Sequence, residues 1–302
     1  MEVFFEIPEF SGNTTVAIGT FDGVHLGHKV VLETACKMAK NDNTPMIIFT
    51  FKDHPAIITG SKQVPQLITL SNEKLELLEK INPDKCIIIE FTKELSLLSP
   101  EQFIQDILIN KLKAKNICVG FNFYFGYKAS GNGQTLIDLS SKYNYKANVI
   151  EPVKVDNETI SSSVIRELIN NGEIEKSNKL LGYKYQISGK VVRGRGVGKS
   201  VLGIPTANMD VNARKLIPEN GVYSCDVFVK DEIKKGIVNI GNRPTFDNGL
   251  KTVETHIIDF DQDIYDEIIK IELKTFLRRE KKFNGIDELK TQILADIEKA
   301  KG

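Results

Sequence analysis

Two histidines stand three residues apart in a glycine-rich stretch, GTFDGVHLGH, which spans residues 19–28 of the 302-residue chain. The chain has four histidines in all, so the pairing of His25 and His28 invites a chemical explanation. Imidazole groups can donate hydrogen bonds to phosphate oxygens and stabilise the charge on a departing group. They can also bind a metal, although structural zinc takes four ligands and no third ligand stands nearby, or simply lie in a turn. We favour phosphate binding, because the glycines permit a tight turn and a close approach of the backbone to a ligand.

The elements around this stretch would place it where α/β proteins bind ligands. Residues 16–18 are apolar and predict a strand over 15–19, and a helical pattern, KVVLETACKMAK, follows. In a parallel sheet, ligands bind beyond the carboxyl ends of the strands. Backbone N–H groups at the N-terminus of the next helix attract anions there, so the surroundings also favour phosphate.

The first half of the chain alternates predicted strands with predicted helices. The strands are expected at 15–19, 46–51, 85–91, 116–120 and 146–150, and the helices at 28–40, 71–81, 99–114, 133–143, 161–172 and 173–182. Ser71, and Ser99 with the proline that follows it, are residue types that begin helices. The alternation predicts an α/β, Rossmann-like domain with a parallel sheet covered on both faces.

After Gly182 the pattern changes to short alternating strands separated by turns. The strands are expected at 184–192, 221–229, 233–241, 252–260 and 268–277, and one helix at 285–301. This order predicts a small antiparallel β-barrel followed by a C-terminal helix. We therefore expect two domains, 1–182 and 183–302, each long enough to bury a core.

The composition argues against several classes of partner. The chain has 40 basic and 40 acidic residues, so no excess of basic charge draws it to nucleic acid or to anionic lipid. We expect no membrane span, because no run of about 18 apolar residues occurs, and no signal peptide, because the N-terminus lacks a basic region. The four cysteines are scattered in apolar stretches, which predicts buried thiols in a reducing cytoplasm. The oligomeric state stays open.

Seven motifs, taken in order, resemble those of one enzyme family. FDGVHLGH by itself resembles the nucleotidyltransferases of the H-x-G-H class. It is followed by FTFKDHP, VGFNFYFG, ISSSVIR, GIPTAN, GNRPTF and VETHIIDF, and the series resembles the bacterial FAD synthetases over essentially the whole chain. That family combines a riboflavin kinase with an FMN adenylyltransferase. The resemblance thus implies flavin biosynthesis, with riboflavin, FMN and ATP as substrates and Mg²⁺ as cofactor.

For the N-terminal half, the resemblance implies transfer of AMP from ATP to FMN with release of pyrophosphate. The two histidines would hold the ATP phosphates, and Asp22 and Gly23 would shape the turn. The other ATP contacts that it implies are Gly19, Phe21, Ser162, Ser163 and Arg166, and the flavin contacts are His54, Asn122, Phe123 and Phe125. Without the resemblance, the serines are ordinary helix caps, His54 is a turn residue, and the aromatic run is part of a core.

For the C-terminal half, the resemblance implies that Glu254 takes the proton from the ribityl 5′-hydroxyl, which then attacks the γ-phosphoryl group of ATP. Thr206 and Asn208 lie two apart on an extended chain and offer oxygen ligands for Mg²⁺. The glycines of an expected flap over the phosphates are Gly194, Gly196 and Gly198. GRGVGKS is not a Walker A loop, because Arg193 stands where its first glycine would be. Without the resemblance, PTAN is a plain turn and Glu254 a solvated strand residue.

Departures from the family pattern leave other functions open. Asn122, Tyr124 and the thinly charged segment after Lys128 differ in the N-terminal half, and Asp266 stands where the family often has glycine. A monofunctional riboflavin kinase with an inactive or regulatory N-terminal module is therefore one alternative. A non-catalytic flavin-binding regulator is disfavoured by Glu254, because binding alone needs no general base. A different nucleotidyltransferase joined to an unrelated barrel is disfavoured by the barrel motifs.

Overall fold

The computed structural model describes residues 1–60, 64–194, 203–242 and 251–301. The chain divides into two compact units, Met1–Ser162 and Ser163–Gly302, whereas the change of sequence pattern lies near residue 182. Gly196 and Gly198, two glycines of the expected flap, lie outside the described residues. Among the helices of the described ranges, none is long and apolar enough to cross a membrane.

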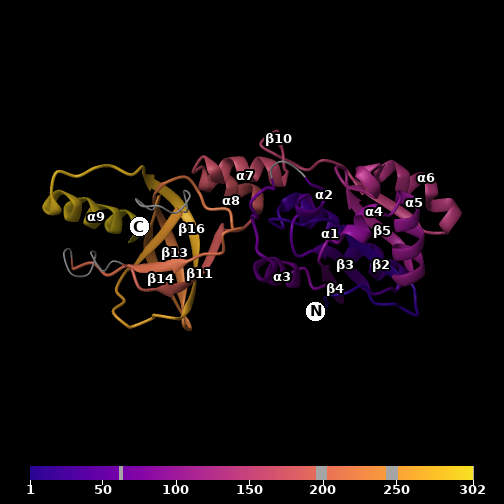
Figure 1. Ribbon diagram of the computed structural model, residues 1–302, viewed down its shortest axis with the longest axis horizontal. Helices are drawn as coiled ribbons and strands as arrows, with labels where there is room; N and C mark the ends of the chain where they lie inside the picture. Colours follow the sequence, from indigo (N-terminus) through magenta and orange to yellow (C-terminus); the bar gives the residue numbers. More distant parts are fainter. Residues whose placement is uncertain (61–63, 195–202, 243–250, 302) are drawn as a thin grey trace. The chain divides into compact units, whose positions relative to one another are not determined.

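The first unit is built on a six-stranded sheet in which every pairing is parallel (Figure 1). The strands lie in the order β1-β4-β3-β2-β5-β8. Their bounds are β1 Glu2–Phe4, β2 Thr14–Ile18, β3 Met46–Phe51, β4 Lys85–Ile89, β5 Ala114–Gly120 and β8 Lys146–Ile150. Every residue of β2 and β3 is buried, as expected for central strands covered on both faces. The predicted parallel sheet is confirmed.

In the described part of the first unit, helices occur at the four places that the sequence pattern predicts, and three short helices occur in addition. They are α1 Leu26–Asp42, α2 Ala56–Thr59, α3 Ser71–Glu79, α4 Lys93–Leu97, α5 Pro100–Gln102, the π-helix η1 Phe103–Lys111, the 3₁₀ turn η2 Tyr127–Ala129 and α6 Gly133–Tyr143. The predicted helix at 99–114 is thus one α-helical turn that continues as a π-helix, which no residue pattern foretells. Ser99 caps it as expected, with its Oγ accepting from the Gln102 N–H at 3.1 Å.

Ser71 does not cap its helix. The residue before the helix is Leu70, whose N–H donates to Glu73 Oε2 at 2.9 Å. The Ser71 hydroxyl instead donates to the carbonyl oxygen of Lys52 at 3.1 Å. The serine therefore joins the helix to the end of β3 rather than closing its first turn. Two short hairpins complete this unit: β6 Tyr124–Phe125 with β7 Gly131–Asn132, and β9 Lys154–Val155 with β10 Glu158–Thr159.

The second unit is a closed antiparallel barrel with helices beside it. The strand order is β11-β12-β15-β14-β13-β16. The elements are α7 Ser162–Asn170, α8 Ile174–Leu181, β11 Gln186–Val192, β12 Ala207–Asp210, β13 Gly221–Val229, β14 Glu232–Asn242, β15 Lys251–Ile257, β16 Ile268–Arg278 and α9 Ile286–Lys301. The predicted barrel and C-terminal helix are confirmed, with β12 as an additional strand. Helix α8 is tied to the barrel by Asn178, whose Nδ2 donates to the Leu273 carbonyl at 2.9 Å.

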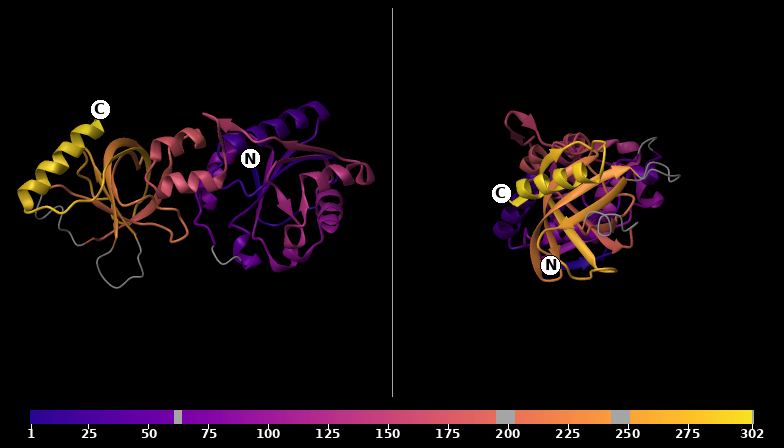
Figure 2. Two further views of the ribbon diagram at one scale, coloured as in Figure 1. Left: turned by 90° about the horizontal axis from the view of Figure 1, so that it is seen from above. Right: turned by 90° about the vertical axis from the view of Figure 1, so that its left-hand side faces the viewer.

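Helix α9 lies along the outside of the barrel (Figure 2). Its buried residues Ile297 and Ala300 join a hydrophobic cluster with Val222 and Ile237. Beside this cluster, the fully buried Asp296 accepts from Arg278 Nε at 2.8 Å. The pair connects the helix to β16 and neutralises a charge that burial would otherwise make costly.

Replacing Asp296 with alanine is expected to lower the free energy of unfolding of the second unit by about 3 kcal/mol, because Arg278 would lose its partner at a largely buried site. Urea unfolding followed by circular dichroism measures the change. The matched control on the same helix is Glu298→Ala, which removes an exposed pair with Lys301 and should cost less than about 1 kcal/mol. Equal losses in the two variants would contradict the assignment.

Candidate active sites

The glycine-rich stretch forms a turn between β2 and α1 and brings both histidines to the helix N-terminus. His25 is the residue before α1, and its Nδ1 accepts from the His28 N–H at 3.2 Å. The two rings stack with centroids 3.5 Å apart, and Phe21 packs edge-on against His28 at 5.3 Å. His25 is buried and His28 half-buried. The imidazoles therefore lie beside the N–H groups of a helix N-terminus, an arrangement suited to an anion.

Asp22 holds the shape of this turn. Its buried carboxylate accepts from the backbone N–H groups of Ile68 and Thr69, at 3.2 and 2.9 Å. The Thr69 hydroxyl in turn accepts from the Gly23 N–H at 3.0 Å. Phe21, Gly23 and Val24 have positive φ angles of 46°, 86° and 35°. Such backbone persists only where the surroundings hold it in place, and the Asp22 contacts supply that support.

The structure brings His54 and Asn122 to the same edge of the sheet as the histidine pair. His54 follows β3 and Asn122 follows β5, and these strands flank β2 on either side. The His54 Nδ1 accepts from the Ala56 N–H at 3.2 Å, so one ring nitrogen is used within its own turn. Asn122 is exposed. The two segments lie at one edge because the strands that they follow are parallel to β2.

The aromatic run after β5 divides between core and surface. Phe123 and Phe125 stack with centroids 5.4 Å apart. Phe125 is buried in the core, where it contacts Phe103 at 5.5 Å, whereas Phe123 is only partly buried. The side chain of Tyr124 is 62% exposed. Only part of this run can therefore face a ligand directly.

In the barrel, Asn208 of β12 stands directly opposite Glu254 of β15. Asn239 of β14 stands opposite Glu254 on its other side. Residues paired in this way share a face of the sheet, with Cβ atoms about 4.5–5.5 Å apart. All three are half-buried, so a row of amide, carboxylate and amide crosses three strands. Thr206 precedes Asn208 by two residues, so the alternation of an extended chain puts it toward the same face.

Two contacts fix the segment that carries Thr206 and Asn208. The Nδ1 atom of His256 lies 2.8 Å from the carbonyl oxygen of Pro205. A Cβ atom added at Gly194 would lie 2.1 Å from the Asn208 Nδ2. The Asn208 amide therefore packs against the backbone at Gly194, and a larger residue there would force the amide to move.

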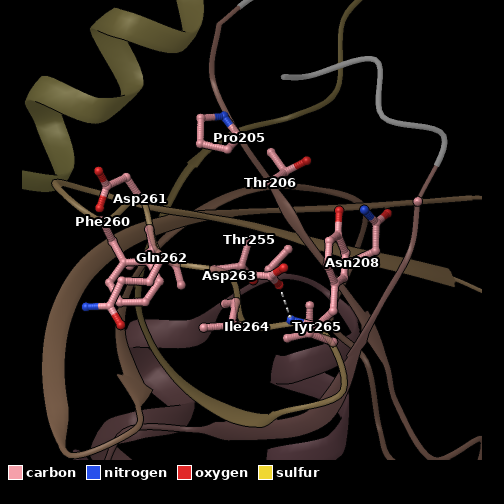
Figure 3. A pocket seen from close by; sticks show the side chains of 14 residues that line it. Pro205, Thr206, Asn208, Thr255, Phe260, Asp261, Gln262, Asp263, Ile264 and Tyr265 are labelled. Carbon is pink, nitrogen blue, oxygen red and sulfur yellow. Dashed lines mark hydrogen bonds between the residues drawn. The ribbon is translucent and has the colours of Figure 1, made fainter. Parts of the chain in front are cut away.

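A pocket with a volume of about 270 Å³ opens beside these residues. It is lined by Thr206 and Asn208 and by the segment 260–265, whose Tyr265 is drawn next to Asn208 (Figure 3). Within that segment, Asp263 Oδ1 accepts from the Tyr265 N–H at 3.0 Å, and the Arg193 guanidinium lies over the Tyr265 ring at 5.6 Å. The hydroxyl of Thr206, the amide of Asn208 and the carboxylates of Asp261 and Asp263 thus line an open pocket.

A metal site of the histidine and cysteine kind does not occur in the described parts of the chain, where no group of three or more His, Cys, Asp or Glu residues could hold an ion. The four cysteines are free thiols, three of them buried and Cys36 half-buried. Burial raises the pKa of the Cys86 and Cys118 thiols to about 12, so both stay protonated at neutral pH.

Comparison with known proteins assigns each half of the chain to a family. A family model described as FAD synthetase matches residues 7–164, and one described as riboflavin kinase matches residues 181–302. A bifunctional riboflavin kinase/FMN adenylyltransferase of Bacillus subtilis is 36% identical over 97% of this chain and 93% of its own. A Haemophilus influenzae protein of the same description is 35% identical over 95% and 92%.

The chain belongs to the bifunctional riboflavin kinase/FMN adenylyltransferase family. It is therefore an enzyme of flavin biosynthesis. The fold is shared over the full length with a crystal structure from Streptococcus pneumoniae, described as a macrolide-efflux protein, at a TM-score of 0.91 and 27% identity, covering 100% of this chain and 99% of the other.

One departure from the pattern of this bifunctional family has a backbone explanation. Asp266, at a position where the sequence resemblance predicts glycine, has a φ angle of 67°. Glycine adopts this left-handed conformation without strain, and aspartate tolerates it better than most residues. The Asp266 carboxylate also pairs with Lys190 at 2.7 Å. The substitution therefore preserves the turn next to the pocket.

Sequence reasoning missed two features of these sites in this bifunctional enzyme. Lys74 is 2% exposed, and its Nζ donates to the carbonyl oxygens of Thr20 and Phe51. Its position was a signal, because it lies on the apolar face of a helix with Leu77 and Leu78. The second missed feature is the pocket-lining segment 260–265, whose acidic and aromatic residues form no pattern that predicts a pocket.

Proposed function

We propose that this chain performs both reactions of its family, phosphorylating riboflavin to FMN in residues 183–302 and adenylylating FMN to FAD in residues 1–182. ATP is the donor in both. The observation that carries the proposal is that each unit has a polar site of its own: the stacked histidines at the N-terminus of α1, and the row centred on Glu254. The match of residues 7–164 to the FAD synthetase model argues against a monofunctional kinase.

In the kinase reaction, Glu254 takes the proton from the 5′-hydroxyl of riboflavin. The hydroxyl oxygen then bonds to the γ-phosphorus of ATP while the bond to the β–γ bridging oxygen breaks, which gives FMN and ADP. Thr206 and Asn208 would hold Mg²⁺, since their hydroxyl and amide oxygens suit this ion and stand beside a carboxylate. When bound, Mg²⁺ would neutralise phosphate charge. Gly194 would lie close to the ATP phosphates, and the family resemblance assigns phosphate contacts to Gly196 and Gly198 as well.

In the adenylyl transfer, a phosphate oxygen of FMN bonds to the α-phosphorus of ATP, the bond to the α–β bridging oxygen breaks, and pyrophosphate leaves. His25 and His28 would bind the ATP phosphates together with the N–H groups of α1. The turn residues Gly19, Phe21, Asp22 and Gly23 would keep this shape. Further phosphate contacts are assigned to Ser162, Ser163 and Arg166 by the family resemblance.

The flavin in this reaction is assigned to the edge of the sheet where β3 and β5 end. His54 and Asn122 would contact its polar groups. Phe123 would stack on the flavin ring, and the buried Phe125 would support Phe123 from behind, since the two rings are parallel within 16°.

The proposal also covers the cellular compartment and the classes of molecule that the chain binds. We infer that the chain acts on small molecules in the cytoplasm and takes no nucleic acid, which is supported by its formal net charge of zero and by the free thiols of the described residues.

The proposal is tested by incubating the protein with riboflavin, ATP and Mg²⁺ and separating the flavins by chromatography. FMN should appear first and FAD second, with ADP and pyrophosphate as co-products. FMN without FAD, even when FMN and reduced flavin are supplied, would establish the monofunctional alternative. Riboflavin binding without turnover would establish a non-catalytic regulator.

The Mg²⁺ assignment predicts that Thr206→Val and Asn208→Ala each raise the Mg²⁺ concentration for half-maximal kinase rate by about tenfold or more, because even indirect metal contacts are worth that much when lost. Thr206→Ser keeps the hydroxyl and should stay close to the parent. Adenylylation of supplied FMN should be unchanged in all three variants, since its proposed groups lie outside the barrel. Equal damage to both activities would refute the assignment.

A further inference from the structure

A buried ammonium group lies at the ends of two central strands in the first unit. Lys74, in helix α3, is 2% exposed. Its Nζ donates to the Thr20 carbonyl at 2.9 Å and to the Phe51 carbonyl at 2.7 Å. Thr20 begins the turn that carries the histidine pair, and Phe51 ends β3, three residues before His54. One side chain thus bonds to both segments of the proposed adenylylation site that follow these strands.

Other bonds from the same region support this connection. The Thr20 carbonyl also accepts from the Thr50 hydroxyl at 3.0 Å. The residues just before α3 bond to the Asp22 carboxylate, and Ser71 bonds to the Lys52 carbonyl at 3.1 Å. Helix α3 and its leading segment therefore contact the turn and the end of β3 at several points, and the Lys74 ammonium group contacts both.

The burial of this lysine disfavours its charge. Burial lowers the pKa of Lys74 to about 8, although the charges of Asp22 and Asp53 oppose the shift. An apolar side chain would avoid this cost, as the neighbouring Leu77 and Leu78 do on the same buried face. The two carbonyl bonds are what an apolar residue could not supply, so they are the reason for placing a lysine here.

We propose that Lys74 is a positioning residue for adenylyl transfer, which holds the turn bearing His25 and His28 at a fixed spacing from the segment bearing His54. The inference rests on the proposed function of the first unit. Its physical basis is that the phosphate oxygen of FMN must meet the α-phosphorus of ATP in one geometry, and a displacement of about 1 Å can cost about 100-fold in rate. Without the hydrogen bonds from Lys74, the two carbonyl groups could move, and the distance between the histidine turn and the His54 segment would vary.

The test compares Lys74→Met with Leu78→Ala in the full chain. Both change a buried residue of α3, but Leu78 has no bond to either carbonyl among the contacts of the described residues. Lys74→Met should lower kcat for adenylylation of FMN by about 100-fold and change the KM for ATP much less, since the imidazoles and the helix N-terminus remain. Leu78→Ala should lower the thermal midpoint while keeping kcat near the parent. Riboflavin phosphorylation in the same preparations is the internal control and should be unchanged.

A second variant keeps the inference testable if Lys74→Met does not fold. Thr50→Val removes the other donor to the Thr20 carbonyl and should lower the same kcat by several-fold, in line with one lost hydrogen bond. A folded Lys74→Met, or failing that Thr50→Val, with the parent kcat would overturn the inference. So would matching losses of kcat in Lys74→Met and Leu78→Ala. A parent protein that makes no FAD would refute the proposed function instead.

Discussion

Replacing Glu254 with glutamine should lower the rate of FMN formation by about 10²–10⁴-fold, the usual cost of removing a general base. Glutamine keeps the size of the side chain and one of its two acceptor oxygens, but it cannot take up the proton of the 5′-hydroxyl. Riboflavin binding, followed by the quenching of flavin fluorescence, should therefore stay near that of the parent. Chromatographic measurement of FMN under single-turnover conditions reads the chemical step itself.

The matched control for this variant is Glu232→Gln. Glu232 also lies in a barrel strand but is exposed and pairs with Lys234 at 2.6 Å, so its loss should leave the kinase rate unchanged. If Glu254→Gln phosphorylates riboflavin at the parent rate, another group takes the proton. Adenylylation of supplied FMN should be intact in both variants.

His28→Ala should lower FAD formation by about 10²–10³-fold, the loss seen when one donor to a developing oxyanion is removed, and leave FMN formation intact. The phosphate charge redistributes most as pyrophosphate departs, so a donor aimed at it acts mainly in the transition state. The affinity for ATP should fall less than the rate, because the N-terminus of α1 still binds phosphate. Steady-state rates with supplied FMN measure both quantities.

His28→Gln separates this role from others, because glutamine retains an N–H donor and should keep part of the activity. If the pair bound a metal, a chelator would mimic the alanine variant in excess Mg²⁺, and elemental analysis would find the ion. If His28 only packed against Phe21 and His25, the loss of FAD formation in the alanine variant would be matched by a loss of stability. A stable His28→Ala protein that makes FAD at the parent rate would refute phosphate binding.

Much of the fold followed from periodicity. The bounds of β3, β8, β13 and α6 agree with the predicted ranges, because long apolar runs and strict alternation leave little choice of structure. Strand β12 was not predicted, because four residues after a proline are too few to establish a period. Its residues Ala207 and Met209 do face inward and are buried. The π-helix escaped because its hydrogen bonding does not depend on residue type.

The sites followed from a different rule. The edge of a parallel sheet at which ligands bind is common to all such sheets, so the histidine turn and His54 could be assigned to one edge from the strand order alone. The contacts of individual side chains could not be predicted from the sequence, because they depend on packing between distant segments. Phe123 and Phe125 have identical chemistry, yet only Phe125 is buried in the core. The burial of Lys74 was not predicted, because a lysine side chain is expected to be solvated.

The pairing of Asn208 with Glu254 also bears on how a protein of this family can change in length. Successive residues of a strand face opposite sides of the sheet, so the loss or gain of one codon within β15 would turn Glu254 inward and bring Val253 or Thr255 to the outer face. A substitution in this strand changes one side chain, whereas an insertion or deletion there removes Glu254 from the row that it forms with Asn208 and Asn239. Length variation among functional relatives should therefore be absent from β12 and β15 and accumulate in connections away from the pocket, such as the one between β16 and α9.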